Sequence, residues 1–244
     1  MRSWLAGFLL AVSLVSAESA TPWRNPVLYL AISSAILIIV TVLVVEFRQF
    51  EEKHKRLLFW LVAIPVVLST LYLAGFVIYK NQASITKGPV HWHADYQVWL
   101  CSQRMDLKDP TGLTNKIGSP LFHEHNDDRI HIEGAVMKLS DVNLANFFKV
   151  IGGKLTRTEI SYPAKDKLHH YKNGDPCPDG SMGTLKVYVN GKLNPNPESY
   201  VISPHSYVPP GDCIIFLFDS SSRTTTSQLC ESWVAENKRY DYGG

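Results

Sequence analysis

Two long apolar runs without a charged residue constrain the fold of this chain more than any other feature. The first extends from Val27 to Val45 and the second from Leu57 to Tyr79. A helix needs about 20 apolar residues to cross the ~30 Å hydrocarbon core of a bilayer, and both runs reach that length. Inside a bilayer the backbone must satisfy its own hydrogen bonds, so both runs are expected to be α-helices. Residues 26–79 are therefore predicted to form a two-helix transmembrane anchor.

The segment between the runs predicts the orientation of the anchor. It contains the basic residues Arg48, Lys53, Lys55 and Arg56. Lys and Arg accumulate in short cytoplasmic loops, so everything after Tyr79 is expected on the outer side of a multi-pass protein of the cell membrane. Residues 1–20 contain a shorter apolar run that ends in small residues, which is typical of a signal peptide or of a first membrane helix.

The remaining composition indicates which partners to expect. Neither long run carries an Asp, Glu, Lys, Arg or His that would mark a transport pathway. The runs are therefore interpreted as an anchor in the lipid bilayer, with other membrane-protein subunits as candidate partners. A net charge of +2 gives no reason to expect nucleic acid. All four cysteines lie in the outer part of the chain, and an even number on an oxidising side predicts two disulfides: Cys101, Cys177, Cys213 and Cys230.

Residues 88–244 are predicted to form an α+β domain. Strict alternation over 91–100 predicts a strand with one buried face, and 121–125 with 129–134 predict a hairpin. A helix is expected to begin at Ser140 and Asp141 and to end at Gly152, with Leu144, Phe147, Phe148 and Ile151 as its apolar stripe. Residues 154–183 are expected to be irregular, and 184–189 and 213–218 to be strands.

This order of hairpin, helix, hairpin and apolar strand predicts a β-grasp-like domain, in which one helix packs across a mixed sheet. The last strand would then run parallel to the first. Because Cys101 ends the first strand and Cys213 begins the last, parallel pairing would hold them beyond the ~7 Å Cα limit for a disulfide. The pairs Cys101–Cys177 and Cys213–Cys230 are therefore favoured among the three connectivities.

Histidines recur at alternate positions in the first half of this domain. Two histidines at i and i+2 of a strand lie on one face, about 7 Å apart at Cα, so their rings can converge on one ion. The pattern occurs twice, and a His-x-Glu pair follows it. The nearby carboxylates share the parity of the histidines, either as ligands or as groups that orient a ring. The candidate metal ligands are His91, His93, His123, His125, His131, Asp95, Asp127 and Glu133.

The types of these residues favour a transition metal. Imidazole and carboxylate together suit Zn²⁺, Cu²⁺, Ni²⁺ or Fe²⁺, whereas Ca²⁺ and Mg²⁺ prefer oxygen alone, and we expect copper or zinc.

The HxHxDH motif of metallo-β-lactamase-type hydrolases is incomplete here, since Asp128 stands where its last histidine belongs. The HxH of amidohydrolases belongs to a barrel of ~250 residues, which is longer than the outer domain. No activated nucleophile stands out, so an enzyme is the less favoured interpretation.

Several short segments occur in a recurring order: HWHADYQV at 91–98, HEH at 123–125, IHIE at 130–133, NFF at 146–148 and LKVYVNGK at 185–192. In this order the chain resembles a group of uncharacterised, His-rich, membrane-anchored extracytoplasmic domains of prokaryotes over about residues 90–218. The resemblance implies a location outside the membrane and the limits of the domain, and it implies no activity.

The sequence thus predicts a membrane-anchored extracytoplasmic metal-binding module that holds copper or zinc, either by itself or as an accessory subunit of a membrane complex. The alternative is a structural or interaction protein of the cell surface, whose His-rich sheet face docks a partner. Metal content separates the two.

Overall fold

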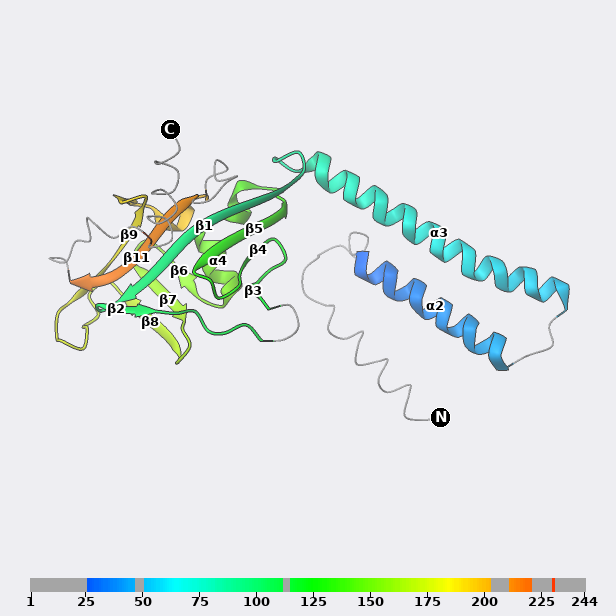
Figure 1. Ribbon diagram of the computed structural model, residues 1–244, viewed down its shortest axis with the longest axis horizontal. Coiled ribbons are helices and arrows are strands. Elements are labelled where there is room, and N and C mark those ends of the chain that lie inside the picture. Colours follow the sequence, from blue (N-terminus) through cyan, green and yellow to red (C-terminus); the bar gives the residue numbers. More distant parts are fainter. Residues whose placement is uncertain (1–25, 47–50, 112–114, 203–210, 221–229, 231–244) are drawn as a thin grey trace, which may run out of the picture. The chain divides into compact units, whose positions relative to one another are not determined.

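The computed structural model describes residues 26–46, 51–111, 115–202, 211–220 and Cys230 (Figure 1). The chain divides into two compact units, residues 1–80 and 81–244. The predicted signal peptide or first membrane helix at 1–20 lies outside the described residues.

The first unit contains helices α2 (Pro26–Glu46) and α3 (Glu52–Ala83). Both are long and apolar enough to cross a membrane, and almost none of their residues are buried. Polar and aromatic side chains join them, because Ser33 and Ser69 share a hydrogen bond between their hydroxyls and the rings of Tyr29 and Tyr72 lie 4.4 Å apart. Leu and Ile side chains exposed all round a helix suit a lipid environment, in which they lose nothing by exposure.

The second unit is built on a mixed sheet in the order β10-β9-β11-β1-β5-β4-β3, with β2 paired to β1. The strands are β1 (Pro89–Leu100), β2 (Gln103–Met105), β3 (Ile117–Gly118), β4 (Phe122–Glu124), β5 (Arg129–Ala135), β9 (Gly183–Val189), β10 (Lys192–Leu193) and β11 (Asp212–Ser220). Strand β11 runs parallel to β1, with Ala94 opposite Asp212 and Leu100 opposite Phe218, as predicted. The α+β class and the mixed sheet are confirmed, while the β-grasp likeness stays a prediction.

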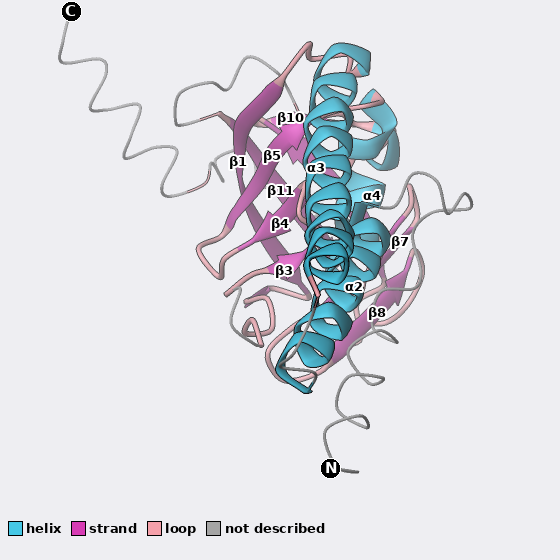
Figure 2. Cartoon of the chain, turned by 90° about the vertical axis from the view of Figure 1, so that its right-hand side faces the viewer, coloured by secondary structure: helices cyan, strands magenta, loops and turns pink. Residues whose placement is uncertain are grey.

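Helix α4 (Leu144–Ile151) covers one face of this sheet (Figure 2). All four members of its predicted apolar stripe are buried. The ring of Phe147 lies 5.4 Å from that of Tyr96 on β1, and the ring of Phe148 lies 4.9 Å from that of Phe216 on β11. The core therefore takes the even-numbered residues of β1 and leaves the histidines on the opposite face.

The start of this helix differs from the prediction. Residues Leu139–Val142 form the 3₁₀ turn η2, and the side chain of Asn143 caps α4 by accepting a hydrogen bond from the N–H of Asn146. Asp141 instead accepts a hydrogen bond from the N–H of Lys138. Gly152 ends the helix in a left-handed conformation, as expected.

The expectation that residues 154–183 are irregular was wrong. This segment forms a three-stranded sheet from β6 (Lys154–Leu155), β7 (Glu159–Pro163) and β8 (Leu168–Lys172). It lies on the same side of the main sheet as α4 (Figure 2), where the hydroxyls of Tyr96 and Tyr162 are 3.2 Å apart and the ring of Tyr171 stacks on Phe218. A second 3₁₀ turn, η3 (Pro197–Ser199), precedes β11.

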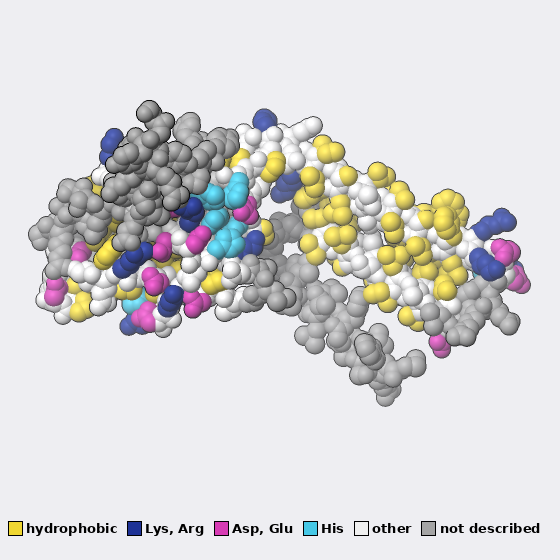
Figure 3. Space-filling model, in the orientation of Figure 1, with side chains coloured by type: hydrophobic (Ala, Val, Ile, Leu, Met, Phe, Trp, Pro, Cys, Tyr) yellow, Lys and Arg dark blue, Asp and Glu magenta, His cyan; other side chains and the backbone are white. Residues whose placement is uncertain are grey.

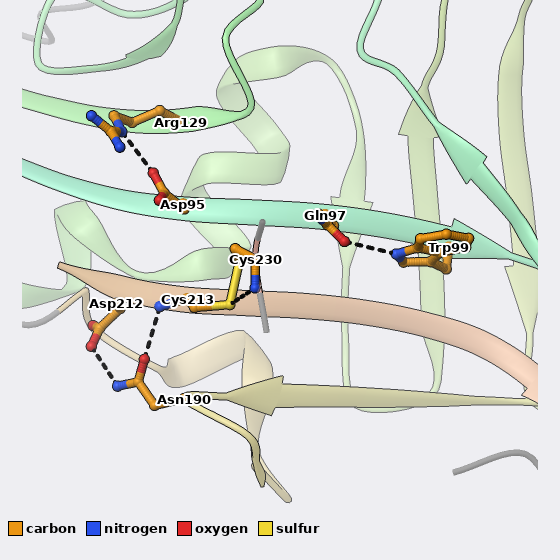
Figure 4. Close-up of a disulfide and its surroundings, with 8 residues drawn as sticks. All are labelled: Asp95, Gln97, Trp99, Arg129, Asn190, Asp212, Cys213 and Cys230. Atoms are coloured by element: carbon orange, nitrogen blue, oxygen red, sulfur yellow. Dashed lines mark hydrogen bonds and ion pairs between the residues drawn. A yellow bond between two sulfur atoms is a disulfide. The ribbon is translucent and has the colours of Figure 1, made fainter. Parts of the chain in front are cut away.

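Both predicted disulfides are present. Cys101 pairs with Cys177, and Cys213 pairs with Cys230. The second bridge lies on the histidine-bearing face, because Cys213 is opposite Asp95 on β1. Beside it, Asn190 accepts a hydrogen bond from the N–H of Cys213 and donates one to Asp212 (Figure 4).

Candidate metal centre

The strand register gathers histidines from three neighbouring strands. His91 lies opposite Glu133, His93 opposite His131, and His131 opposite His123. Residues opposite each other in an antiparallel pair point to the same face, so β1, β5 and β4 present these side chains together. Most of the histidine surface visible in Figure 3 gathers in one patch on this unit.

Three of these histidines converge closely enough to share an ion. Ligand nitrogens of His91, His93 and His131 all lie within 4.8 Å of one another. The Nε2 atoms of His91 and His93 are 3.0 Å apart. Two nitrogens that bind one tetrahedral Zn²⁺ at about 2.0–2.1 Å lie roughly 3.3 Å from each other. Small side-chain rotations would therefore bring the three nitrogens to ligand distance.

His123 and His125 extend the cluster on the other side of His131. The ring centroids of His123 and His125 are 4.9 Å apart, and those of His125 and His131 are also 4.9 Å apart. The ring of His123 stacks on that of His131 at 5.6 Å. All five predicted histidine ligands thus belong to one group.

The cluster is open at one end and closed at the other. The side chain of His91 is 62% exposed, that of His131 is 12% exposed and that of His123 is fully buried. An ion could therefore enter from solvent beside His91, while the side chain of His123 has no contact with solvent.

Hydrogen bonds to neighbouring groups set which ring nitrogens are free to bind a metal. Nδ1 of His125 donates to the carbonyl oxygen of Asn115 at 2.7 Å, which leaves Nε2 with its lone pair. Nε2 of His131 lies 3.1 Å from Oδ2 of Asp127, so Nδ1 is left as its acceptor. That Nδ1 atom is buried and has no hydrogen-bond partner in the described structure. Asp127 therefore orients a ring.

Glu133 stands between the two ends of the cluster. Its Oε1 lies 3.1 Å from Nε2 of His91, and its Oε2 lies 3.7 Å from Nε2 of His123. Neither ring nitrogen of His123 has a hydrogen-bond partner among the described residues. A buried polar atom without a partner is costly, so the environment of His123 suits a bound cation.

Asp95 lies next to the cluster and has a different partner. Its Oδ1 accepts a hydrogen bond from Nε of Arg129 at 2.6 Å, and its side chain is only 2% exposed (Figure 4). The charge of Asp95 is thus balanced by a guanidinium from the neighbouring strand. We expect Asp95 to fix the position of β5 beside β1 and to act on an ion only indirectly.

Glu124, which was not among the predicted site residues, shapes the turn beside the histidines. Its buried carboxylate accepts hydrogen bonds from the N–H groups of Asn126, Asp127 and Asp128, at 2.6, 2.7 and 3.1 Å. Burial raises the pKa of Glu124, although these hydrogen bonds oppose the change. The turn residues Asn126 and Asp128 have left-handed backbones, which Asn and Asp tolerate. Glu124 thereby holds Asp127 where it reaches His131.

Two histidines have pKa values below their ordinary value of 6.5. Burial, followed by repulsion from His131 and His91, lowers the pKa of His93 to about 4. Burial, followed by the charge of Lys116, lowers the pKa of His123. Both rings are neutral at physiological pH, which is the form that binds metals.

The carboxylate of Asp127 stays ionised beside the neutral histidine rings. Burial acts to raise the pKa of Asp127, but the hydrogen bond and the charge of His131 outweigh it, and the pKa lies below its usual range. Neutral imidazoles beside an ionised carboxylate form a donor set for a divalent transition metal.

No known protein family, no curated protein and no solved structure matches this chain.

Proposed function

We propose that this protein is a membrane-anchored metal-binding module, which holds copper or zinc on the extracytoplasmic side. The observation that carries the proposal is the convergence of ligand nitrogens from His91, His93 and His131 within 4.8 Å. They come from two paired strands of a disulfide-linked, β-grasp-like domain, which supplies the rigid support that a metal site requires.

The donor set favours copper or zinc over harder cations. Three imidazoles with carboxylates nearby match the preferences of these two ions. Three protein ligands leave a further coordination position, and the exposed side chain of His91 allows solvent or a partner to reach it. This arrangement supports holding an ion that is later passed on, as an accessory subunit of a membrane complex would do.

The helices of the first unit support the proposed location. Two apolar helices could span a membrane. The basic residues Lys53, Lys55 and Arg56 at the start of α3 favour a cytoplasmic position for that end. A multi-pass anchor in the lipid bilayer then holds the histidine cluster outside, where the two disulfides are stable.

The proposal is tested by metal binding to the full chain, purified in detergent without a histidine tag. Equilibrium dialysis against Zn²⁺, followed by elemental analysis, measures ions bound per chain. His93→Ala should remove at least one ion, because His93 is central among the three converging rings. The control is His170→Ala, a histidine of β8 beside Glu159 that lies outside the cluster.

Two outcomes would contradict the proposal. Unchanged Zn²⁺ binding by His93→Ala would show that the cluster is not the site. A parent protein that binds no Zn²⁺ or Cu²⁺, together with loss of folding in His93→Ala, would favour the alternative in which the histidine face is structural or docks a partner.

A further inference from the structure

The cluster contains more metal donors than one ion can use. Five imidazoles and Glu133 face one another, whereas a tetrahedral Zn²⁺ takes only four ligands. The group of three that converges most tightly leaves out His123 and His125. These two residues therefore need a role of their own.

His123 is the stronger indication of a second position. Its side chain is fully buried, and neither of its ring nitrogens has a hydrogen-bond partner among the described residues. Proteins satisfy nearly all buried polar atoms, so such a ring points to a group that is absent from the protein chain. Beside it, His125 holds its Nε2 lone pair free because its Nδ1 donates to the carbonyl oxygen of Asn115.

Glu133 has the geometry of a bridge between two ions. Its Oε1 is 3.1 Å from Nε2 of His91, and its Oε2 is 3.7 Å from Nε2 of His123. Both values are close to the roughly 3.3 Å that separates two ligands of one tetrahedral ion. Each oxygen thus belongs with a different end of the cluster. Carboxylates that join ions about 3.5–4 Å apart occur in two-metal sites.

We propose that the cluster holds two transition-metal ions bridged by the carboxylate of Glu133. His91, His93 and His131 bind the ion nearer to solvent, and His123 and His125 bind the buried ion. This inference rests on the proposed function and adds the number of ions and their division among the ligands.

The experiment measures Zn²⁺ stoichiometry in the full chain in detergent without a histidine tag, by equilibrium dialysis and elemental analysis. The parent protein should bind two ions. His125→Ala should bind one, and His93→Ala should also bind one, while His170→Ala should bind two. His125 is partly exposed and is chosen over the fully buried His123, whose replacement would threaten folding. Near-ultraviolet circular dichroism checks that each variant is folded.

The outcomes separate the two proposals. One ion in the parent, lost in His93→Ala and kept in His125→Ala, would overturn the second position and leave the proposed function standing. One ion lost in either variant would show a single mononuclear site and would also overturn it. No ion in the parent would overturn both proposals.

The bridge itself has a separate readout. With Cu²⁺ as the probe, two ions joined by a carboxylate couple their spins, so the integrated electron paramagnetic resonance signal should fall below the copper content. Glu133→Gln should restore the signal to the full copper content. A full signal in the parent loaded with two Cu²⁺ ions would overturn the bridge.

Discussion

Gly118 on β3 leaves no room for a side chain beside His123. A Cβ atom there would lie 2.4 Å from the carbonyl oxygen of Phe122 and 3.0 Å from Cα of His123, and its backbone has φ of +123°. Glycine is the residue that adopts such a conformation without strain. The close approach lets β3 pack against the strand that carries His123.

Gly118→Ala should therefore destabilise the outer domain and open the buried end of the cluster. We expect a loss of more than about 1 kcal/mol, from backbone strain together with steric overlap. The matched control is Gly174→Ala, since Gly174 also has a positive φ but has nothing within 4 Å of its Cβ position. Thermal melts of both variants measure the difference. Equal melting temperatures would show that the close approach of β3 to Phe122 and His123 contributes nothing.

The lowered pKa of His93 predicts an acid-sensitive domain. Its pKa is about 4 in the folded protein, against 6.5 for the ordinary group. The unfolded chain then binds more protons between these values, so the stability contributed by neutral His93 is present above pH 6.5 and is lost as the pH falls toward 4. Urea midpoints of the metal-free protein should be lower at pH 5 than at pH 7. In His93→Gln this decrease should be smaller, and an identical decrease would contradict the assignment to His93.

At the scale of elements, the start of α4 shows which of several candidate residues caps the helix. Ser140, Asp141 and Asn143 are all residues that cap helices, and the sequence alone does not rank them. The structure uses Asn143, whose side chain accepts the N–H of Asn146 at 2.8 Å. Asn143→Ala should cost about 1 kcal/mol, and Ser140→Ala should cost almost nothing. Chemical denaturation of the two variants tests this, and a larger loss for Ser140→Ala would contradict the assigned cap.

Patterns within single elements made most of the fold predictable. Alternation of apolar and polar residues over 91–100 predicted β1 and its two faces. The unbroken apolar run at 213–218 predicted the buried strand β11. The small sheet was missed because its strands are short and β7 ends in a proline. Its stability comes from contacts distant in sequence, such as that between Tyr162 and Tyr96, which no local pattern contains.

The candidate site was predictable to the same degree. The spacing of the histidines placed them on one face, and the register confirms this for His91, His93, His123 and His131. Spacing could not predict which donors converge, because that depends on how three strands pair. Nor could it assign Asp95 to Arg129, or Glu124 to the turn, since both pairings depend on burial and hydrogen bonding.

At the scale of the whole molecule, the pairing of the cysteines links topology to location. Parallel pairing of β1 with β11 keeps Cys101 and Cys213 at opposite ends of the two strands, so each bonds to a cysteine elsewhere. All four cysteines are therefore used without a free thiol. A fully disulfide-bonded domain is typical of the extracytoplasmic side. The basic residues at the start of α3 favour the cytoplasm for that end of the helix.

The disulfides of the outer domain and the basic residues at the start of α3 predict opposite sides of the membrane for the C-terminus and the start of α3. An epitope tag at residue 52 should resist protease added to intact cells, whereas a tag at the C-terminus should be cleaved, and permeabilised cells should lose both. Lys53→Glu combined with Lys55→Glu removes positive charge from the segment and should allow a fraction of the chains to insert in the reverse orientation. Cleavage of both tags in intact cells would contradict the orientation, and with it the extracytoplasmic position of the histidine cluster.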